Sequence, residues 1–105
     1  MYDIIVVGGG LVGLATAYKT QLKFPNKKVL LLEKEKELSL HQSGRNSGVI
    51  HSGLYYKPGS LRAKNCVLGR HELVAFSKQH NIQHDVCGKL VVATNQKELD
   101  VLPGL

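Results

Sequence analysis

Two short apolar runs flank a segment of mixed apolar and polar residues at the start of the chain. Residues 2–7 form a β-branched run that ends in glycines, and residues 29–32 form a second apolar run. Between them, apolar side chains recur at helical spacing from Leu11 to Leu22, with lysines on the opposite face. Short continuous apolar runs are typical of strands buried on both faces of a parallel sheet. The pattern therefore predicts a strand–helix–strand (βαβ) unit, with its first strand at the centre of a parallel sheet.

The second half of the chain predicts a long helix, a hairpin and the start of another helix. A Pro-Gly turn precedes Ser60, which suits the N-cap of a helix that runs to about His80. Residues 83–86 and 89–94 read as two strands around a central glycine, so we expect an antiparallel hairpin. Asn95 stands three residues before a glutamate, a spacing typical of a capping box at a helix start.

Length, cysteine content and the longest apolar runs restrict the class of protein. With 105 residues, 43% of them hydrophobic, the chain has room for one small domain. Cys66 and Cys87 fit neither a disulfide framework nor a zinc motif, so we expect reduced, buried thiols and no metal site. No apolar run approaches the roughly 18 residues of a membrane span. Met1 leads directly into the first predicted strand, so we expect no signal or transit peptide and a cytoplasmic protein.

The positive charge is concentrated in one stretch. A net charge of +6 is typical of proteins that bind nucleic acid, a phospholipid surface or a phosphorylated ligand. Residues 39–71 contain no Asp or Glu and carry these cations: Arg45, Lys57, Arg62, Lys64 and Arg70. Neither interleaved aromatic residues nor a recognition-helix pattern accompanies them, so we expect no nucleic-acid partner.

A dinucleotide-binding motif lies between the first predicted strand and the first helix. Gly8, Gly10 and Gly13 form G-x-G-x-x-G, which allows a tight turn, close approach of backbone to a pyrophosphate, and close helix–strand packing. Glu33 lies at the end of the second predicted strand, where a carboxylate accepts hydrogen bonds from ribose hydroxyls. A carboxylate there disfavours the 2′-phosphate of NADP. The motif by itself does not distinguish NAD from FAD.

A loop downstream suits the far half of an extended cofactor. Residues 41–53 are rich in Gly, Ser and Asn, so their backbone can run close to a ligand, and Asn46, Ser47 and Ser52 can hydrogen-bond to it. Alone, this segment would indicate only a polar surface loop. Its position after the dinucleotide motif indicates a cofactor-binding loop.

Several segments together closely resemble a known flavoprotein family. They are residues 8–13, 31–34, 41–61 and 87–94, of which the third, HQSGRNSGVIHSGLYYKPGSL, is far more specific than the glycine motif. The chain resembles, over nearly its whole length, the N-terminal portion of FAD-dependent L-2-hydroxyglutarate oxidase/dehydrogenase, in the D-amino-acid-oxidase-like superfamily. Arg45 departs from the histidine usual in that family.

The resemblance implies a fold and a division into domains. We expect an α/β chain with an incomplete Rossmann-type FAD-binding domain over residues 1–82, built on the βαβ unit and a following helix. Residues 83–105 would then form the first strands of a truncated substrate domain. By itself, the 105-residue chain is expected to be inactive.

The resemblance also implies FAD as cofactor and a role for each site residue. Gly8, Gly10 and Gly13 would hold the pyrophosphate, and Glu33 would bind the adenosine ribose. The stretch from pyrophosphate to flavin would be lined by Asn46, Ser47 and Gly48. His51 would lie close to the flavin, and it is the candidate for the catalytic base, since histidine suits proton transfer near neutral pH.

The implied reaction is the oxidation of L-2-hydroxyglutarate to 2-oxoglutarate by hydride transfer to flavin. Its substrate is a small dicarboxylate, which would account for part of the basic stretch, particularly Arg62. A solvated basic surface is the favoured explanation for Lys57, Lys64 and Arg70. Oxygen or a quinone would accept the electrons, and peripheral association of the parent enzyme with the inner face of the membrane stays open.

Two alternatives remain at this stage. An FAD-linked glycerol-3-phosphate dehydrogenase shares a similar loop, and its phosphate would also explain the basic stretch. The chain could instead be a non-catalytic nucleotide-binding fragment. The remaining histidines, for which we expect no paired carboxylate and only surface or packing roles, are His41, His71, His80 and His84.

Overall fold

The computed structural model of the protein describes residues 1–104. The chain forms two compact units. The first unit comprises Met1–Gly48, and the second begins at Val49. The first contains a strand–helix–strand arrangement and a short 3₁₀ turn, η1 (Gln42–Gly44). The second contains two α-helices and a terminal 3₁₀ turn, η2 (Leu102–Gly104).

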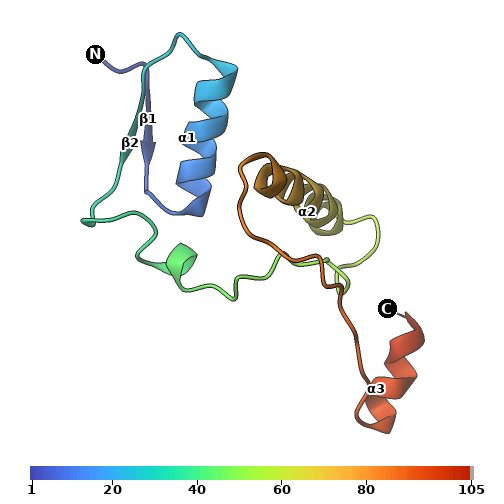
Figure 1. Cartoon of the computed structure of the whole chain (residues 1–105). Helices are drawn as coiled ribbons and strands as arrows, with labels where there is room; N and C mark the ends of the chain where they lie inside the picture. The colour runs from blue at the N-terminus through green and yellow to red at the C-terminus, as the bar shows by residue number, and fades with distance from the viewer. Residues whose placement is uncertain (105) are drawn as a thin grey trace. The chain divides into compact units, whose positions relative to one another are not determined.

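The first unit is the predicted βαβ arrangement. Strand β1 (Ile4–Val7) leads through the glycine turn into helix α1 (Leu11–Lys23), which is followed by strand β2 (Val29–Leu32) (Figure 1). The two strands are parallel, with Ile4 opposite Val29 and Val7 opposite Leu32. Helix α1 contacts both strands along one face of the sheet. The carboxyl ends of both strands therefore lie at one edge, beside the start of α1.

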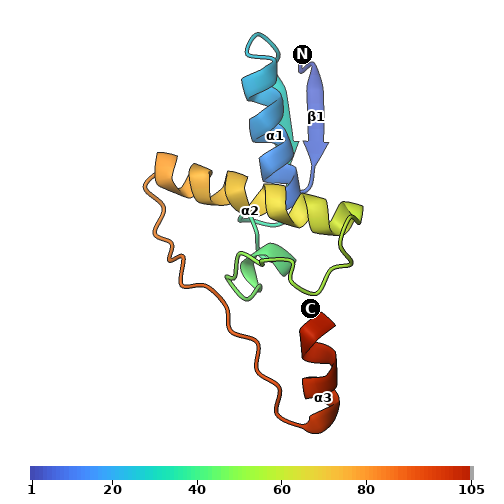
Figure 2. The same cartoon turned by 90° about the vertical axis from the view of Figure 1, so that its right-hand side faces the viewer.

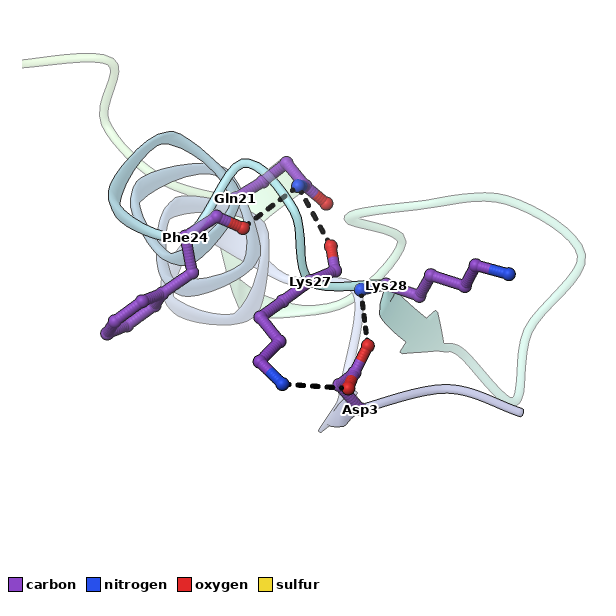
Figure 3. A network of polar contacts seen from close by, with 5 residues as sticks. All are labelled: Asp3, Gln21, Phe24, Lys27 and Lys28. Atoms are coloured by element: carbon purple, nitrogen blue, oxygen red, sulfur yellow. Dashed lines mark hydrogen bonds and ion pairs between the residues drawn. The ribbon is translucent and has the colours of Figure 1, made fainter.

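A polar network joins the opposite end of this unit (Figure 3). The Asp3 carboxylate accepts a hydrogen bond from the backbone N–H of Lys28 at 2.8 Å and pairs with the Lys27 ammonium at 3.1 Å. The Gln21 amide on α1 donates to the carbonyl of Lys27 at 3.0 Å. These contacts hold the turn between α1 and β2 against the start of β1, and so support the strand register.

One face of β1 is open in this structure, contrary to the prediction of a central strand buried on both faces. Ile5 is 56% exposed and Val7 is 82% exposed, while Ile4 and Val6 are half-buried. The physical reason is that α1 covers only one face, and β1 has a single neighbouring strand in the described sheet. No hydrophobic side chain in residues 1–104 is fully buried.

The second unit is organised around a long helix. Helix α2 (Leu61–Gln79) is the long helix of this unit (Figure 2). It starts at the predicted N-cap, where the Ser60 hydroxyl accepts a hydrogen bond from the Ala63 N–H at 3.2 Å. Helix α3 (Gln96–Val101) starts at Asn95, whose side chain accepts from the Glu98 N–H at 3.0 Å. Both capping predictions are confirmed.

The predicted hairpin is wrong for this structure. Residues 83–86 and 89–94 form no strand, although Gly88 has the positive φ of a tight turn, +78°. An isolated two-stranded hairpin is marginal in water and needs an apolar surface to cover. Here Leu90 is 91% exposed, so β propensity has no packing partner to support strand pairing.

Both cysteines are free thiols, as predicted, but neither is buried. Cys66 on α2 is half-buried and Cys87 is exposed. The expectation of two buried thiols is therefore corrected, because the segment around Cys87 packs on no core. Within the described part of the chain, no helix combines the length and apolar character needed to cross a membrane.

Candidate functional site

The glycine turn between β1 and α1 has the geometry that the motif predicts. Gly8 has a φ of +104°, a conformation that L side chains rarely adopt. A Cβ at Gly13 would collide with the carbonyl oxygen of Gly8, so the first turn of α1 lies directly on the end of β1. Gly10 is the N-cap of α1. Because glycine has no side chain, the N-cap residue itself makes no capping hydrogen bond to the first turn of the helix. The turn therefore exposes backbone at the N-terminus of α1.

Glu33 lies beside this turn, immediately after β2. Its carboxylate accepts hydrogen bonds from the N–H of Gly9 at 2.6 Å and from the N–H of Glu35 at 3.0 Å. These backbone donors, Glu35 first and Gly9 next, lower the pKa of Glu33 below its ordinary value. Glu33 is therefore an ionised acceptor held at the carboxyl edge of the sheet, where the sequence predicts it to meet a ribose.

Ser43 completes the N-terminus of α1 from a distant part of the chain. Its hydroxyl oxygen accepts a hydrogen bond from the Leu11 N–H at 2.7 Å, across 32 positions of sequence. A Cβ at Gly10 would lie 3.1 Å from this oxygen. The sequence pattern does not indicate this role for Ser43, because capping patterns involve residues that are neighbours in the chain. Its presence in the Gly/Ser-rich segment was the only available signal.

A pocket of about 390 Å³ opens at this edge of the sheet. It is lined by the ends of both strands, the glycine turn and the segment up to Ser43. The lining residues are Val7, Gly8, Gly10, Leu32, Glu33, Lys34, Glu35, Ser39, Leu40, His41, Gln42 and Ser43. Three of the predicted cofactor residues, Gly8, Gly10 and Glu33, are thus brought together, and Gly13 supports the turn from behind.

His41 differs from expectation because it has a carboxylate partner. Its Nε2 lies 3.0 Å from Oε1 of Glu35, and the Lys34 ammonium lies 3.4 Å from the same oxygen. His41 and Glu35 both line the pocket. The sequence did not reveal this pair, since six positions of irregular loop separate the two residues and no periodic pattern relates them.

The residues that we expect along the stretch from pyrophosphate to flavin form a turn, and this turn is not part of the pocket lining. The Asn46 side chain donates to the carbonyl of Ser43 and accepts from the N–H of Gly48 at 2.6 Å. Gly48 has a φ of +66°, as a left-handed turn requires. Asn46 therefore organises the segment that carries Ser43, while Ser47 and Gly48 lie in the same turn and do not line the pocket.

His51 belongs to the second unit, where its backbone is attached to α2. The thiol of Cys66 donates to the His51 carbonyl oxygen, with 3.2 Å between Sγ and O. The His51 side chain is exposed. In the same unit, the Arg62 guanidinium lies over the Tyr56 ring at 5.5 Å and the Lys89 ammonium over the Tyr55 ring at 4.8 Å. Two cations thus lie on the aromatic pair that follows His51.

The first unit's residues fit the adenosine diphosphate part of a dinucleotide. Gly8 and Gly10 line the pocket without side chains, and α1 has no acidic residue in its first turn to neutralise the helix dipole. Glu33 supplies an ionised carboxylate, a group that can accept hydrogen bonds from hydroxyl groups. The helix N-terminus and this carboxylate are therefore suited to a phosphate next to a ribose.

Known proteins match the chain over nearly its whole length. Residues 3–104 match the protein family described as FAD dependent oxidoreductase. An L-2-hydroxyglutarate dehydrogenase of Indibacter alkaliphilus is 57% identical over 104 residues, which make up 99% of this chain and 26% of that protein. A mitochondrial L-2-hydroxyglutarate dehydrogenase of Homo sapiens is 52% identical over 99% of this chain and 22% of its own length. An L-2-hydroxyglutarate dehydrogenase of Escherichia coli is 45% identical over 100% of this chain and 25% of its own length.

The chain spans about a quarter of the length of the curated relatives it matches. The glycine motif did not distinguish NAD from FAD. FAD is the cofactor of the matched family, so the dinucleotide is FAD and not NAD. The matched residues include the glycine turn, Glu33 and the segment from His41 to Gly53.

Proposed function

Because the chain belongs to the family of FAD dependent oxidoreductases, we propose that it is part of an enzyme that oxidises L-2-hydroxyglutarate to 2-oxoglutarate. The observation that carries the proposal is the identity of 45–57%, across nearly the whole chain, to proteins named L-2-hydroxyglutarate dehydrogenase. A substrate of this class, a small dicarboxylate, also suits part of the acid-free basic stretch, residues 39–71, particularly Arg62.

In this proposal the first unit holds the adenosine end of FAD. Gly8, Gly10 and Gly13 bring backbone against the pyrophosphate, and the ionised Glu33 accepts hydrogen bonds from the ribose hydroxyls. Support comes from the pocket that Gly8, Gly10 and Glu33 line together and from the two backbone donors that keep Glu33 ionised.

Asn46, Ser47 and Gly48 continue the binding surface toward the flavin. The turn that Asn46 closes exposes backbone in a left-handed conformation at Gly48, which favours close approach of a ligand. In this proposal Asn46 acts mainly by holding the turn, since its amide is engaged with Ser43 and Gly48.

His51 is the proposed base. Bound FAD supplies an acceptor for the hydride that leaves the hydroxyl-bearing carbon of the substrate. The hydroxyl proton must leave with it, so that C–OH becomes C=O, and the exposed imidazole of His51 takes that proton. Electrons then pass to oxygen or a quinone.

The decisive experiment is an anaerobic absorbance titration of the purified, flavin-loaded full-length enzyme of which we propose this chain to be a part. L-2-hydroxyglutarate should bleach the flavin band and yield an equimolar amount of 2-oxoglutarate. The D-enantiomer and glycerol 3-phosphate serve as matched controls. Bleaching by glycerol 3-phosphate alone would favour the glycerol-3-phosphate dehydrogenase alternative, and flavin that no hydroxy acid reduces would favour a non-catalytic nucleotide-binding protein.

The proposal also retains the compartment expected from the sequence, the cytoplasm. Some relatives are named mitochondrial, and others are bacterial, so the names of relatives do not determine the compartment of this chain. Cell fractionation tests this compartment, and we expect the protein in the cytosolic fraction. Protein that sediments with membranes and is released by high salt would indicate peripheral association instead.

A further inference from the structure

Helix α2 is attached to the loop that carries His51. Cys66 lies on the second turn of the helix, and its thiol donates to the carbonyl oxygen of His51, 15 positions earlier in the chain. The distance between Sγ and O is 3.2 Å, which is short for a thiol donor. The contact therefore restrains the backbone of His51 itself.

Gly53 provides a second contact between the loop and the same cysteine. A Cβ at Gly53 would lie 3.0 Å from Sγ of Cys66 and 3.1 Å from its Cβ, so the loop backbone packs directly on this side chain. Gly53 also has a φ of +79°, which favours glycine on conformational grounds. Cys66 thus touches the loop two residues apart, at the carbonyl of His51 and at the backbone of Gly53.

The helix that presents Cys66 is well anchored at its start. Its N-cap, Ser60, accepts from the Ala63 N–H, and Arg62 lies over the ring of Tyr56. A capped helix is a more precise support for a reacting group than the irregular loop that carries His51. The second cysteine offers a natural comparison, because the exposed Cys87 donates to the carbonyl of the adjacent Gly88, at 3.6 Å.

We infer that Cys66 is a positioning residue, whose thiol hydrogen bond and contact with Gly53 hold His51 in place for proton transfer. This inference rests on the proposed function, in which His51 is the base. In this role Cys66 acts through His51, with no bond to the substrate and no redox change. Its effect is geometric, since small displacements of a base reduce the rate of proton transfer more than they reduce substrate binding.

The experiment uses the flavin-loaded full-length enzyme. It compares Cys66→Ala, which removes the hydrogen-bond donor to the His51 carbonyl, with Cys66→Ser, whose hydroxyl keeps a donor. We expect Cys66→Ala to lower kcat about five-fold per bound flavin, on the order of one lost hydrogen bond, with KM changed less than about two-fold. Cys66→Ser should restore kcat to within about two-fold of wild type. Cys87→Ala is the matched control and should equal wild type. If Cys66→Ala does not retain flavin, Cys66→Val provides the donor-free comparison.

A double variant tests whether Cys66 acts through His51. In a His51→Gln background, Cys66→Ala should cause no further decrease in kcat, because the group that it positions is already gone. Equal rates for Cys66→Ala and wild type, or a Cys66→Ser variant as slow as Cys66→Ala, would overturn the positioning role. A His51→Gln variant with wild-type kcat would instead contradict the assignment of His51 in the proposed function.

Discussion

The Glu33 carboxylate accepts a hydrogen bond from the backbone N–H of Gly9 at 2.6 Å, and so connects the end of β2 to the glycine turn after β1. The two residues are 24 positions apart. They meet because parallel strands bring their carboxyl ends to one edge of the sheet. The carboxylate that we propose for the ribose therefore also orders the turn that we propose for the pyrophosphate.

Replacing Glu33 should weaken FAD binding in two ways, because it removes the proposed acceptor for the ribose hydroxyls and the hydrogen bond that orders the glycine turn. We expect Glu33→Gln to raise the dissociation constant of FAD about ten-fold, since one neutral acceptor remains, and Glu33→Ala to raise it by about a hundred-fold. Equilibrium titration of the apoprotein, followed by flavin fluorescence, measures both. Glu37→Gln, an exposed change four residues further along, is the control and should leave the affinity unchanged. Wild-type affinity in Glu33→Ala would contradict the ribose assignment.

The same carboxylate should make stability depend on pH in the acid range. Hydrogen bonds from Glu35 and Gly9 lower the pKa of Glu33 in the folded protein below its ordinary value of 4.5. Its stabilising contribution is therefore complete above that ordinary value and is lost as the pH falls through the lowered, native pKa. The difference in Tm between wild type and Glu33→Gln should be constant from pH 7 to about 5 and should shrink at lower pH. A difference that grows toward acid pH would show the opposite linkage.

Two helical glycines should respond oppositely to the same substitution. A Cβ at Gly13 would collide with the Gly8 carbonyl, whereas a Cβ at Gly69 on α2 meets no atom within 4 Å. We expect Gly13→Ala to reduce the free energy of unfolding by ~2 kcal/mol and to weaken FAD binding, because β1 and α1 must separate. Gly69→Ala should increase the free energy of unfolding by ~0.5 kcal/mol through helix propensity. Urea denaturation of the two variants checks both signs, and a neutral Gly13→Ala would refute the close packing.

Ser43 should behave as a cap for α1 although it lies far along the chain. Ser43→Ala removes the acceptor of the Leu11 N–H, and we expect it to reduce the free energy of unfolding by ~1 kcal/mol. Ser43→Thr keeps the hydroxyl and should recover most of that loss. Ser60→Ala, which removes the local cap of α2, provides a matched scale and should cost a similar amount. A destabilisation by Ser43→Thr equal to that by Ser43→Ala would indicate a steric role instead.

The features that depend on neighbouring residues could be predicted from the sequence. The βαβ order follows from apolar spacing, and the starts of α2 and α3 follow from Ser60 and Asn95, whose side chains cap amides three residues ahead. The glycine turn was predicted for the same reason, because the demands for a positive φ at Gly8 and for close packing at Gly13 are local.

The hairpin over residues 83–94 and the double burial of β1 were predicted incorrectly because both depend on surfaces outside the segment concerned. Strand propensity in residues 89–94 describes a side-chain preference for a packed, pleated surface, and Leu90 meets none here. Ile5 and Val7 likewise give β1 a second apolar face, but no element of the described chain covers it, so both side chains are exposed.

By itself, the sequence determined the order of the βαβ unit, the starts of the two later helices, the glycine turn, the two free thiols and the resemblance to a flavoprotein family. Only the tertiary structure decided which distant groups meet: Ser43 at the start of α1, His41 beside Glu35, and Cys66 under the carbonyl of His51. The physical reason is that caps and turns are encoded within a few residues, whereas a hydrogen bond across 15 or 32 positions exists only where the folded chain brings donor and acceptor within reach.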